Sequence, residues 1–115
     1  MKTKEVKDFL KNFFIKKQEL DEWMEVFKKK EVSTLSEQHL KMLKQHQHLS
    51  EILDITLKFL TEEELKIIRM TYIEQLTNIQ LAESLNVSLS TASKRKRDSS
   101  MKLAKKIQIL IQQAA

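Results

Sequence analysis

The chain has 115 residues, a formal net charge of +5 and no glycine, proline or cysteine. An average composition would supply about 8 glycines and about 6 prolines at this length. Without glycine there is no glycine-rich phosphate loop, dinucleotide fingerprint or GxSxG nucleophile elbow, and without cysteine there is no disulfide, thiolate metal site or cysteine nucleophile. Leu, Lys, Glu, Gln and Ile are abundant, so we predict an all-α fold. No apolar run approaches the roughly 18 residues of a membrane span, and we expect a soluble, cytoplasmic protein without a signal peptide.

Residues 3–30 carry apolar side chains at helical spacing. Four of them lie seven residues apart, namely Val6, Phe13, Leu20 and Phe27. One long amphipathic helix would explain this pattern, and so would two shorter helices that meet near Lys16 and Lys17. Aromatic side chains in such a stripe favour core or interface packing over a ligand pocket. The candidates for dimerisation or partner binding are Phe9, Phe13, Leu20, Trp23 and Phe27.

The second predicted helix runs from about Ser36 to Phe59. Thr34 to Glu37 has the spacing of a capping box, which places the start of this helix near Ser36. The helix is expected to lie antiparallel to the first helix. Residues 1–60 would then form an N-terminal helical hairpin. A lone pair of helices cannot bury both faces well, so the hairpin should pack on the C-terminal region, on a second copy, or on both.

Residues 61–115 are predicted to form a second unit, a helix-turn-helix domain with a C-terminal helical extension. Thr61 precedes three glutamates, which is the spacing of a second capping box and places acids at the positive end of a helix dipole. The third helix should run from there to about Glu74. A fourth helix, capped by Thr77 or Asn78, should end at Leu85.

The three residues after Leu85 have the chemistry of a tight turn between two helices. Asn86 tolerates a left-handed backbone conformation better than any residue except glycine. Val87 should face the core, and Ser88 should cap the fifth helix through its hydroxyl. That helix would continue to Ile111 or beyond, because nothing in the sequence stops it.

The excess positive charge is concentrated in this last helix. Residues 88–115 hold seven basic residues and one acid, whereas residues 61–87 hold two basic and five acidic residues. A cationic helix after a tight turn is typical of a recognition helix, here residues 89–106, in the major groove of double-stranded DNA. The alternative is that Lys94 to Arg97 are a solvated helix face. The candidate DNA-binding residues are Ser88, Ser90, Thr91, Ser93, Lys94, Arg95, Arg97 and Lys102.

We assign roles to these side chains from their chemistry. Arg97 or Lys94 is favoured for a base contact, and Arg95 for a contact to the phosphate backbone. Asp98 lies four residues from both Lys94 and Lys102 and is expected to restrain those two side chains.

From Leu60 to Ile107 the chain resembles region 4 of bacterial sigma-70 factors. The matching residues are Thr61 to Glu64, Leu81 to Leu85, Asn86 to Ser88, Ser90 to Ala92, and Lys102-Leu103. The resemblance implies a transcriptional regulator, and the upstream helices make the chain similar to small phage and mobile-element regulators of the ArpU and RinA type. Ala92, Lys96, Ser99 and Leu103 should form the inward stripe of the fifth helix, where the family usually has a larger apolar residue in place of Lys96. Either the lysine stem crosses the edge of the core, or the helix is rotated from this register.

We therefore predict a sequence-specific, homodimeric DNA-binding regulator associated with the nucleoid. An alternative is an interaction module that binds RNA polymerase or another regulator without reading DNA. A basic helix lying on a membrane surface is less favoured, because polar residues 98–100 interrupt its apolar face. We expect no catalytic centre, cofactor or metal: His39 and His46 share a helix face, but His48 points elsewhere, and no acid joins them at the i+4 position.

Overall fold

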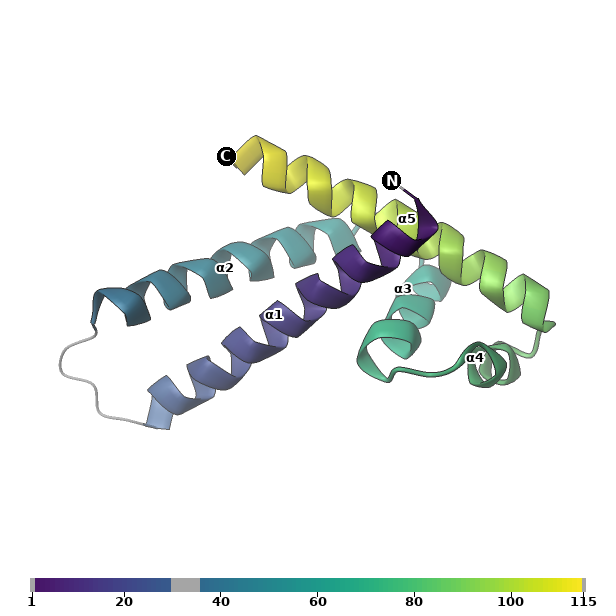
Figure 1. Cartoon of the computed structure of the whole chain (residues 1–115), viewed down its shortest axis with the longest axis horizontal. Coiled ribbons are helices and arrows are strands. Elements are labelled where there is room, and N and C mark those ends of the chain that lie inside the picture. Colours follow the sequence, from purple (N-terminus) through teal and green to yellow (C-terminus); the bar gives the residue numbers. More distant parts are fainter. Residues whose placement is uncertain (1, 30–35, 115) are drawn as a thin grey trace.

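The computed structural model describes residues 2–29 and 36–114, and every element in this part of the chain is helical. The elements are α1 (Thr3–Lys29), α2 (Glu37–Leu57), α3 (Glu62–Ile68), the π-helix η1 (Arg69–Ile73), α4 (Asn78–Leu85) and α5 (Leu89–Ala114). The prediction of an all-α fold is confirmed. Figure 1 shows α1 and α2 as a hairpin, α5 crossing α1 near its N-terminal end, and α3 and α4 beneath the first half of α5.

The first 27-residue helix is continuous, which decides between the two interpretations of its sequence. No break occurs near Lys16 and Lys17. The Lys17 ammonium lies 3.1 Å from the Asp21 carboxylate, one helical turn away. A cation in the apolar seam is therefore accommodated by an ion pair on the same helix.

The main core joins the hairpin to the C-terminal region. Its buried members come from α1, α2, the turn before α3, α3 itself and α5: Val6, Leu10, Phe13, Phe14, Ile52, Leu60, Ile68, Leu103, Ala104 and Ile107. The hairpin thus buries its apolar face against α3 and α5, which is one of the partners expected for it. The core crosses the expected boundary at residue 60.

This packing buries some of the residues that were predicted to form an interface. Phe13 and Leu20 are 7% and 1% exposed, so they lie inside the chain. Phe9 is partly buried against the main core. Trp23 is exposed and Phe27 is half-buried, with their rings stacked 5.9 Å apart. Of the five candidates, Trp23 is therefore the one that is exposed to a partner, with Phe27 beside it.

The start of α2 agrees with the sequence, and its end is slightly earlier. Ser36 is the N-cap, and its hydroxyl accepts a hydrogen bond from the backbone N–H of His39 at 3.3 Å. The proposed role of Thr34 in a capping box lies outside the described residues. The helix ends at Leu57 instead of Phe59.

The third helix differs from the prediction of one α-helix to about Glu74. It leaves α geometry after Ile68 and continues as a π-helix, in which the Glu74 N–H bonds to the Arg69 carbonyl. Tertiary contacts hold Tyr72 on this wider turn. Its ring stacks on Phe14 at 5.6 Å, and its hydroxyl donates to Ser100 Oγ at 2.8 Å. Helical periodicity alone could not reveal these contacts to α1 and α5.

Candidate nucleic-acid interface

The helix-turn-helix is built from three local backbone devices. Thr77 caps α4 through a capping box with Gln80, which decides between Thr77 and Asn78 as the cap. Asn86 ends the helix in the left-handed conformation, with φ 56° and ψ 46°. Ser88 then caps α5 by accepting a hydrogen bond from the Thr91 N–H at 3.2 Å. The predicted roles of Asn86 and Ser88 are confirmed.

A small separate core sets the angle between α4 and α5. Its buried residues are Ile67, Leu81, Ala82 and Ala92, with Met70, Leu85 and Val87 packed against it. Ala82 and Ala92 have small side chains, so the two helices approach closely here. This core therefore holds the start of α5 in one orientation beyond the turn.

The predicted DNA-binding residues lie at or near the surface of α5. Ser88, Ser90, Lys94, Arg95 and Arg97 are exposed, whereas Thr91, Ser93 and Lys102 are partly buried. At the helix start, the Ser88 hydroxyl lies 2.8 Å from Thr91 Oγ1 and 3.2 Å from Ser90 Oγ. Hydroxyl groups and free backbone N–H groups are thus gathered where an anion would be favoured.

Two of the predicted cations are neutralised by the acidic start of α3. Arg95 Nη1 lies 2.9 Å from Glu63 Oε1, and Lys102 Nζ lies 3.0 Å from Glu64 Oε1. The hydrogen bond from the Thr61 backbone N–H, together with the Lys102 ammonium, holds the pKa of Glu64 below its usual value despite partial desolvation. The capping glutamate therefore also anchors α5.

The expected role of Asp98 is corrected by this arrangement. Its carboxylate lies 3.8 Å from Arg97 Nε, and Lys102 pairs with Glu64 instead. Helical spacing identified Asp98 as a neighbour of Lys102, but Glu64 competes for that lysine from a different helix. The Glu64 carboxylate is already oriented by its bond to Thr61.

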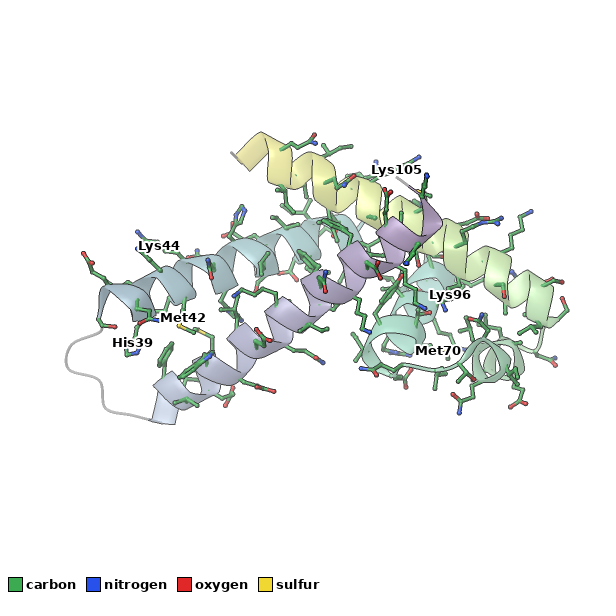
Figure 2. All side chains as sticks on the ribbon, viewed as in Figure 1. His39, Met42, Lys44, Met70, Lys96 and Lys105 are labelled. Atoms are coloured by element: carbon green, nitrogen blue, oxygen red, sulfur yellow. The ribbon has the colours of Figure 1, made fainter. Side chains whose placement is uncertain are left out.

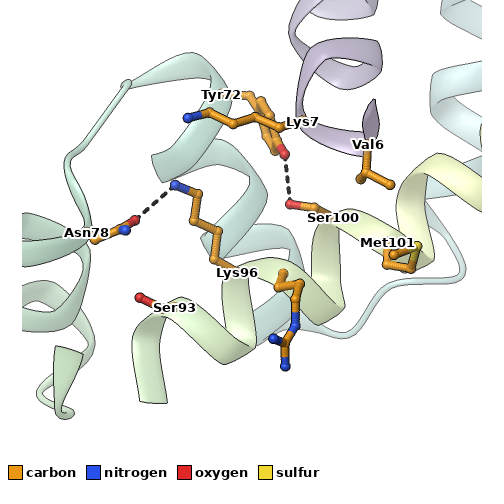
Figure 3. Close-up of a pocket in the computed structure, with 9 residues that line it drawn as sticks. Val6, Lys7, Tyr72, Asn78, Ser93, Lys96, Ser100 and Met101 are labelled. Atoms are coloured by element: carbon orange, nitrogen blue, oxygen red, sulfur yellow. Dashed lines mark hydrogen bonds between the residues drawn. The ribbon is translucent and has the colours of Figure 1, made fainter. Parts of the chain in front are cut away.

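The position of Lys96 decides between the two interpretations of the inward stripe of α5. Ala92, Ser99 and Leu103 are buried as expected, and Lys96 is partly buried beside them. Its ammonium donates to Asn78 Oδ1 at 2.9 Å, as Figure 3 shows. The helix is therefore not rotated, and the lysine stem crosses the core edge to a polar partner. Desolvation, and then the nearby charge of Lys7, lower the pKa of Lys96.

The structure also brings α1 residues beside α5, which the sequence did not predict. Lys7 lines a cavity of about 280 Å³ together with Lys96 and two predicted DNA-binding residues, Ser93 and Arg97. Lys7 and Lys11 are four residues apart on α1, a spacing visible in the sequence. Nothing in the sequence, however, indicated that this end of α1 crosses α5.

His39 and His46 lie elsewhere, and each engages a side chain of α1. Figure 2 places His39 near the end of the hairpin remote from Lys96. Its ring lies 4.8 Å from that of Phe27, and His46 Nε2 lies 2.6 Å from Asp21 Oδ1. Over residues 2–29 and 36–114, no three potential metal ligands of the His, Cys, Asp or Glu type form a group. In the same part of the chain, no helix has the length and apolar character needed to cross a bilayer.

Comparison with known proteins identifies one region. The family model described as Sigma-70, region 4 matches residues 56–105. No curated protein and no solved structure matches the chain. The matched residues contain α3, η1, α4 and the first two-thirds of α5, together with the turn at Asn86. The resemblance noted from the sequence is thus confirmed for this part of the chain.

Proposed function

Because residues 56–105 form a sigma-70 region 4 helix-turn-helix of the DNA-binding type, we propose that the chain is a sequence-specific DNA-binding transcriptional regulator. The observation that carries this proposal is the left-handed turn at Asn86. It directs α5 away from α4 and leaves Ser88, Ser90 and Lys94 exposed at the start of a cationic helix. In the proposed complex, residues 89–106 lie in the major groove.

The side chains would divide into positioning and reading groups. Ser88, Ser90 and the backbone N–H groups at the start of α5 bind phosphate. Lys94 and Arg97 reach base edges, for which guanine offers two acceptors. Arg95 contacts the phosphate backbone by exchanging the Glu63 carboxylate for a phosphate oxygen. Because Glu63 already satisfies Arg95, this contact contributes less affinity than an unpaired cation would.

We propose a homodimer as the binding species. A single module of this size makes few base contacts, and two copies related by a two-fold axis read half-sites about one helical turn apart. The exposed Trp23 and its stacked neighbour Phe27 support the C-terminal end of α1 as the contact between copies. Trp23→Ala should shift the molecular mass measured by sedimentation from dimer towards monomer. A wild-type mass of one chain at all concentrations would reject the dimer.

The selection of bound sites from a random pool of duplex DNA tests the function directly. We expect an enriched motif, and replacement of Lys94, Arg95 and Arg97 by Ala should abolish binding to it. If each protomer neutralises about five phosphates, log K should fall with log salt at a slope of about −4 to −5 for one protomer and about twice that for the proposed dimer. The matched control replaces three exposed lysines away from α5, Lys16, Lys41 and Lys44, and should bind as wild type.

Unchanged binding by the Lys94, Arg95 and Arg97 variant would reject the site. If no motif is enriched and the chain instead associates with RNA polymerase in a salt-insensitive manner, the interaction-module alternative would replace the proposal. We also propose that the chain is a regulator of the small phage and mobile-element type.

A further inference from the structure

A cationic cleft lies between α1, η1 and α5. It consists of two neighbouring cavities of about 280 and 230 Å³, and both are lined by Lys7, Tyr72 and Lys96. The first extends along α5 to Ser93 and Arg97, and the second extends along α1 to Lys11. Figure 3 shows the side chains of Lys7 and Lys96 converging on this space, with Asn78 of α4 at its edge.

The lining of the cleft carries cations but no anion among the described residues. Lys7, Lys11, Lys96 and Arg97 line the two cavities, and no carboxylate lines either of them in the described chain. The Lys96 ammonium has a neutral partner, Asn78 Oδ1. Arg97 has the Asp98 carboxylate beside it at 3.8 Å, outside the lining. Cations that face a common space without an anion repel one another, so an entering anion would be stabilised by all of them.

The lowered pKa of Lys96 supports this interpretation of the charge distribution. Partial burial is its first cause, and the positive charge of Lys7 is its second. An anion placed between the two ammonium groups would reverse the second effect, because it would favour the charged form of Lys96.

Uncharged hydrogen-bonding groups surround the cations. Because Asn78 Oδ1 accepts from Lys96, the amide nitrogen of Asn78, which lines the first cavity, is left as a donor. The Ser93 hydroxyl lines the first cavity. Thr71 lines the second, and its Oγ1 is buried without a hydrogen-bond partner among the described residues. An anionic oxygen in the first cavity could accept from the Asn78 amide and the Ser93 hydroxyl, whereas the buried Thr71 Oγ1 is not accessible to it.

The backbone that forms one wall is irregular. Thr71 and Tyr72 lie on the π-helix η1, and Gln75, which follows it, has φ 56°. π-turns and left-handed residues other than glycine cost conformational energy and are concentrated at functional sites. Each cavity is smaller than the roughly 300–1,000 Å³ typical of a drug-sized ligand, which favours a compact anionic group over a large organic molecule.

We propose that this cleft binds a phosphate group between the ammonium groups of Lys7 and Lys96. The phosphate is supplied either by the backbone of a bound duplex or by a free phosphorylated compound. Ser93 and Arg97 line the cleft and also belong to the proposed DNA surface, so a backbone phosphate beside the recognition helix would reach it. The duplex source rests on the proposed function, whereas the free source does not.

The test uses the full chain with Lys7→Gln and Lys96→Met. Met keeps an unbranched stem at the core edge, and Gln replaces an exposed lysine, so the helical circular dichroism should be unchanged. Lys7→Gln alone provides a second variant that leaves the core untouched. The matched control, Lys16→Gln with Lys44→Gln, removes the same charge from exposed positions outside the cleft.

The first arm titrates inorganic phosphate and pyrophosphate against the chain and follows backbone amide chemical shifts. Saturable shifts at Thr71, Tyr72 and Ser93 that persist in the control and disappear in both cleft variants identify a free phosphorylated ligand. The second arm measures the salt dependence of binding to the selected duplex. A backbone phosphate predicts that the double variant binds all sequences more weakly and that its log–log salt slope is less steep by about 1 per lost contact.

Either result supports the proposal and identifies the source of the phosphate. Phosphate titrations without saturable shifts, combined with a wild-type salt slope in the double variant, would overturn it. The outcome for the proposed function is separate, because that depends on Lys94, Arg95 and Arg97. If the chain binds no duplex at all, the phosphate titration alone decides the matter.

Discussion

The two flanks of α5 carry similar side chains in opposite electrostatic surroundings. On the flank facing α3, Arg95 and Lys102 each lie within about 3 Å of a glutamate carboxylate at the start of that helix. On the flank facing α1 and η1, Lys96 meets Lys7 and a neutral amide, and none of the described carboxylates lines the two cavities. The number of basic residues in a helix therefore does not determine the electrostatic potential around it, because carboxylates on packed neighbours compensate some of the charges and not others.

The largest expected effect on stability comes from removing a buried side chain of α5, the helix to which both flanks belong. Leu103 is fully buried between the hairpin and α3. Leu103→Ala should lower the free energy of unfolding by about 2–5 kcal/mol through lost burial and a residual cavity. Urea unfolding measures the change, and Ile109→Ala, at a half-exposed position on the same helix, is the control that should cost much less.

The turn before α5 should have the next largest effect. Asn86→Ala places a Cβ without a hydrogen-bonding side chain in the left-handed region and should cost about 1–2 kcal/mol. Asn86→Gly adopts the same backbone conformation freely and should lie close to wild type in thermal unfolding. Equal losses in the two variants would show that the Asn86 side chain, and not its backbone conformation, matters.

A pair of identical substitutions separates the two flanks. Lys102→Met removes a cation from Glu64 and should lower the free energy of unfolding by about 0.2–1 kcal/mol, the usual contribution of a partly exposed ion pair. Lys96→Met relieves desolvation and repulsion by Lys7, so the protein should be equally stable or slightly more stable. Chemical denaturation at low salt compares them. A greater loss for Lys96→Met would contradict the difference between the flanks.

The smallest effect is a dependence on pH through Glu64. Its pKa in the folded chain is below the usual value of 4.5, so its stabilisation is complete above about pH 4.5 and is lost as pH falls through the folded pKa. Glu64→Gln keeps an oxygen for the Thr61 N–H but carries no charge. Wild type should exceed this variant by about 0.5 kcal/mol at pH 7, and the gap should close in acid. A gap that is constant from pH 7 to 3 would contradict the assignment.

Much of the local architecture could be predicted from the sequence. Ser36, Thr61 and Thr77 begin their helices, Asn86 ends one, and Ser88 caps the last, because each acts on backbone groups two or three residues away. The helix-turn-helix and its exposed hydroxyl and cationic residues follow from the same short-range chemistry. The sequence also identified Lys96 as an exception in the inward stripe of α5.

Contacts between distant elements were decided by the tertiary structure. Tyr72 in the π-turn contacts Phe14 and Ser100, and Lys102 forms an ion pair with Glu64. Both sets of contacts join elements that are far apart in sequence. Phe13 is an aromatic residue at a position that the sequence suggested for an interface, but it is buried in the core between the hairpin and α5.

Capping, helical periodicity and turn chemistry act over a few residues, so the amino-acid sequence by itself determined where the helices begin, where they end and which faces are apolar. The crossing of α1 over α5 depends on which of several apolar faces pack together, and periodicity does not encode that choice. Only the folded chain brings Lys7 to Lys96 and Glu64 to Lys102, because residues far apart in sequence interact strongly only at the few ångströms to which packing brings them.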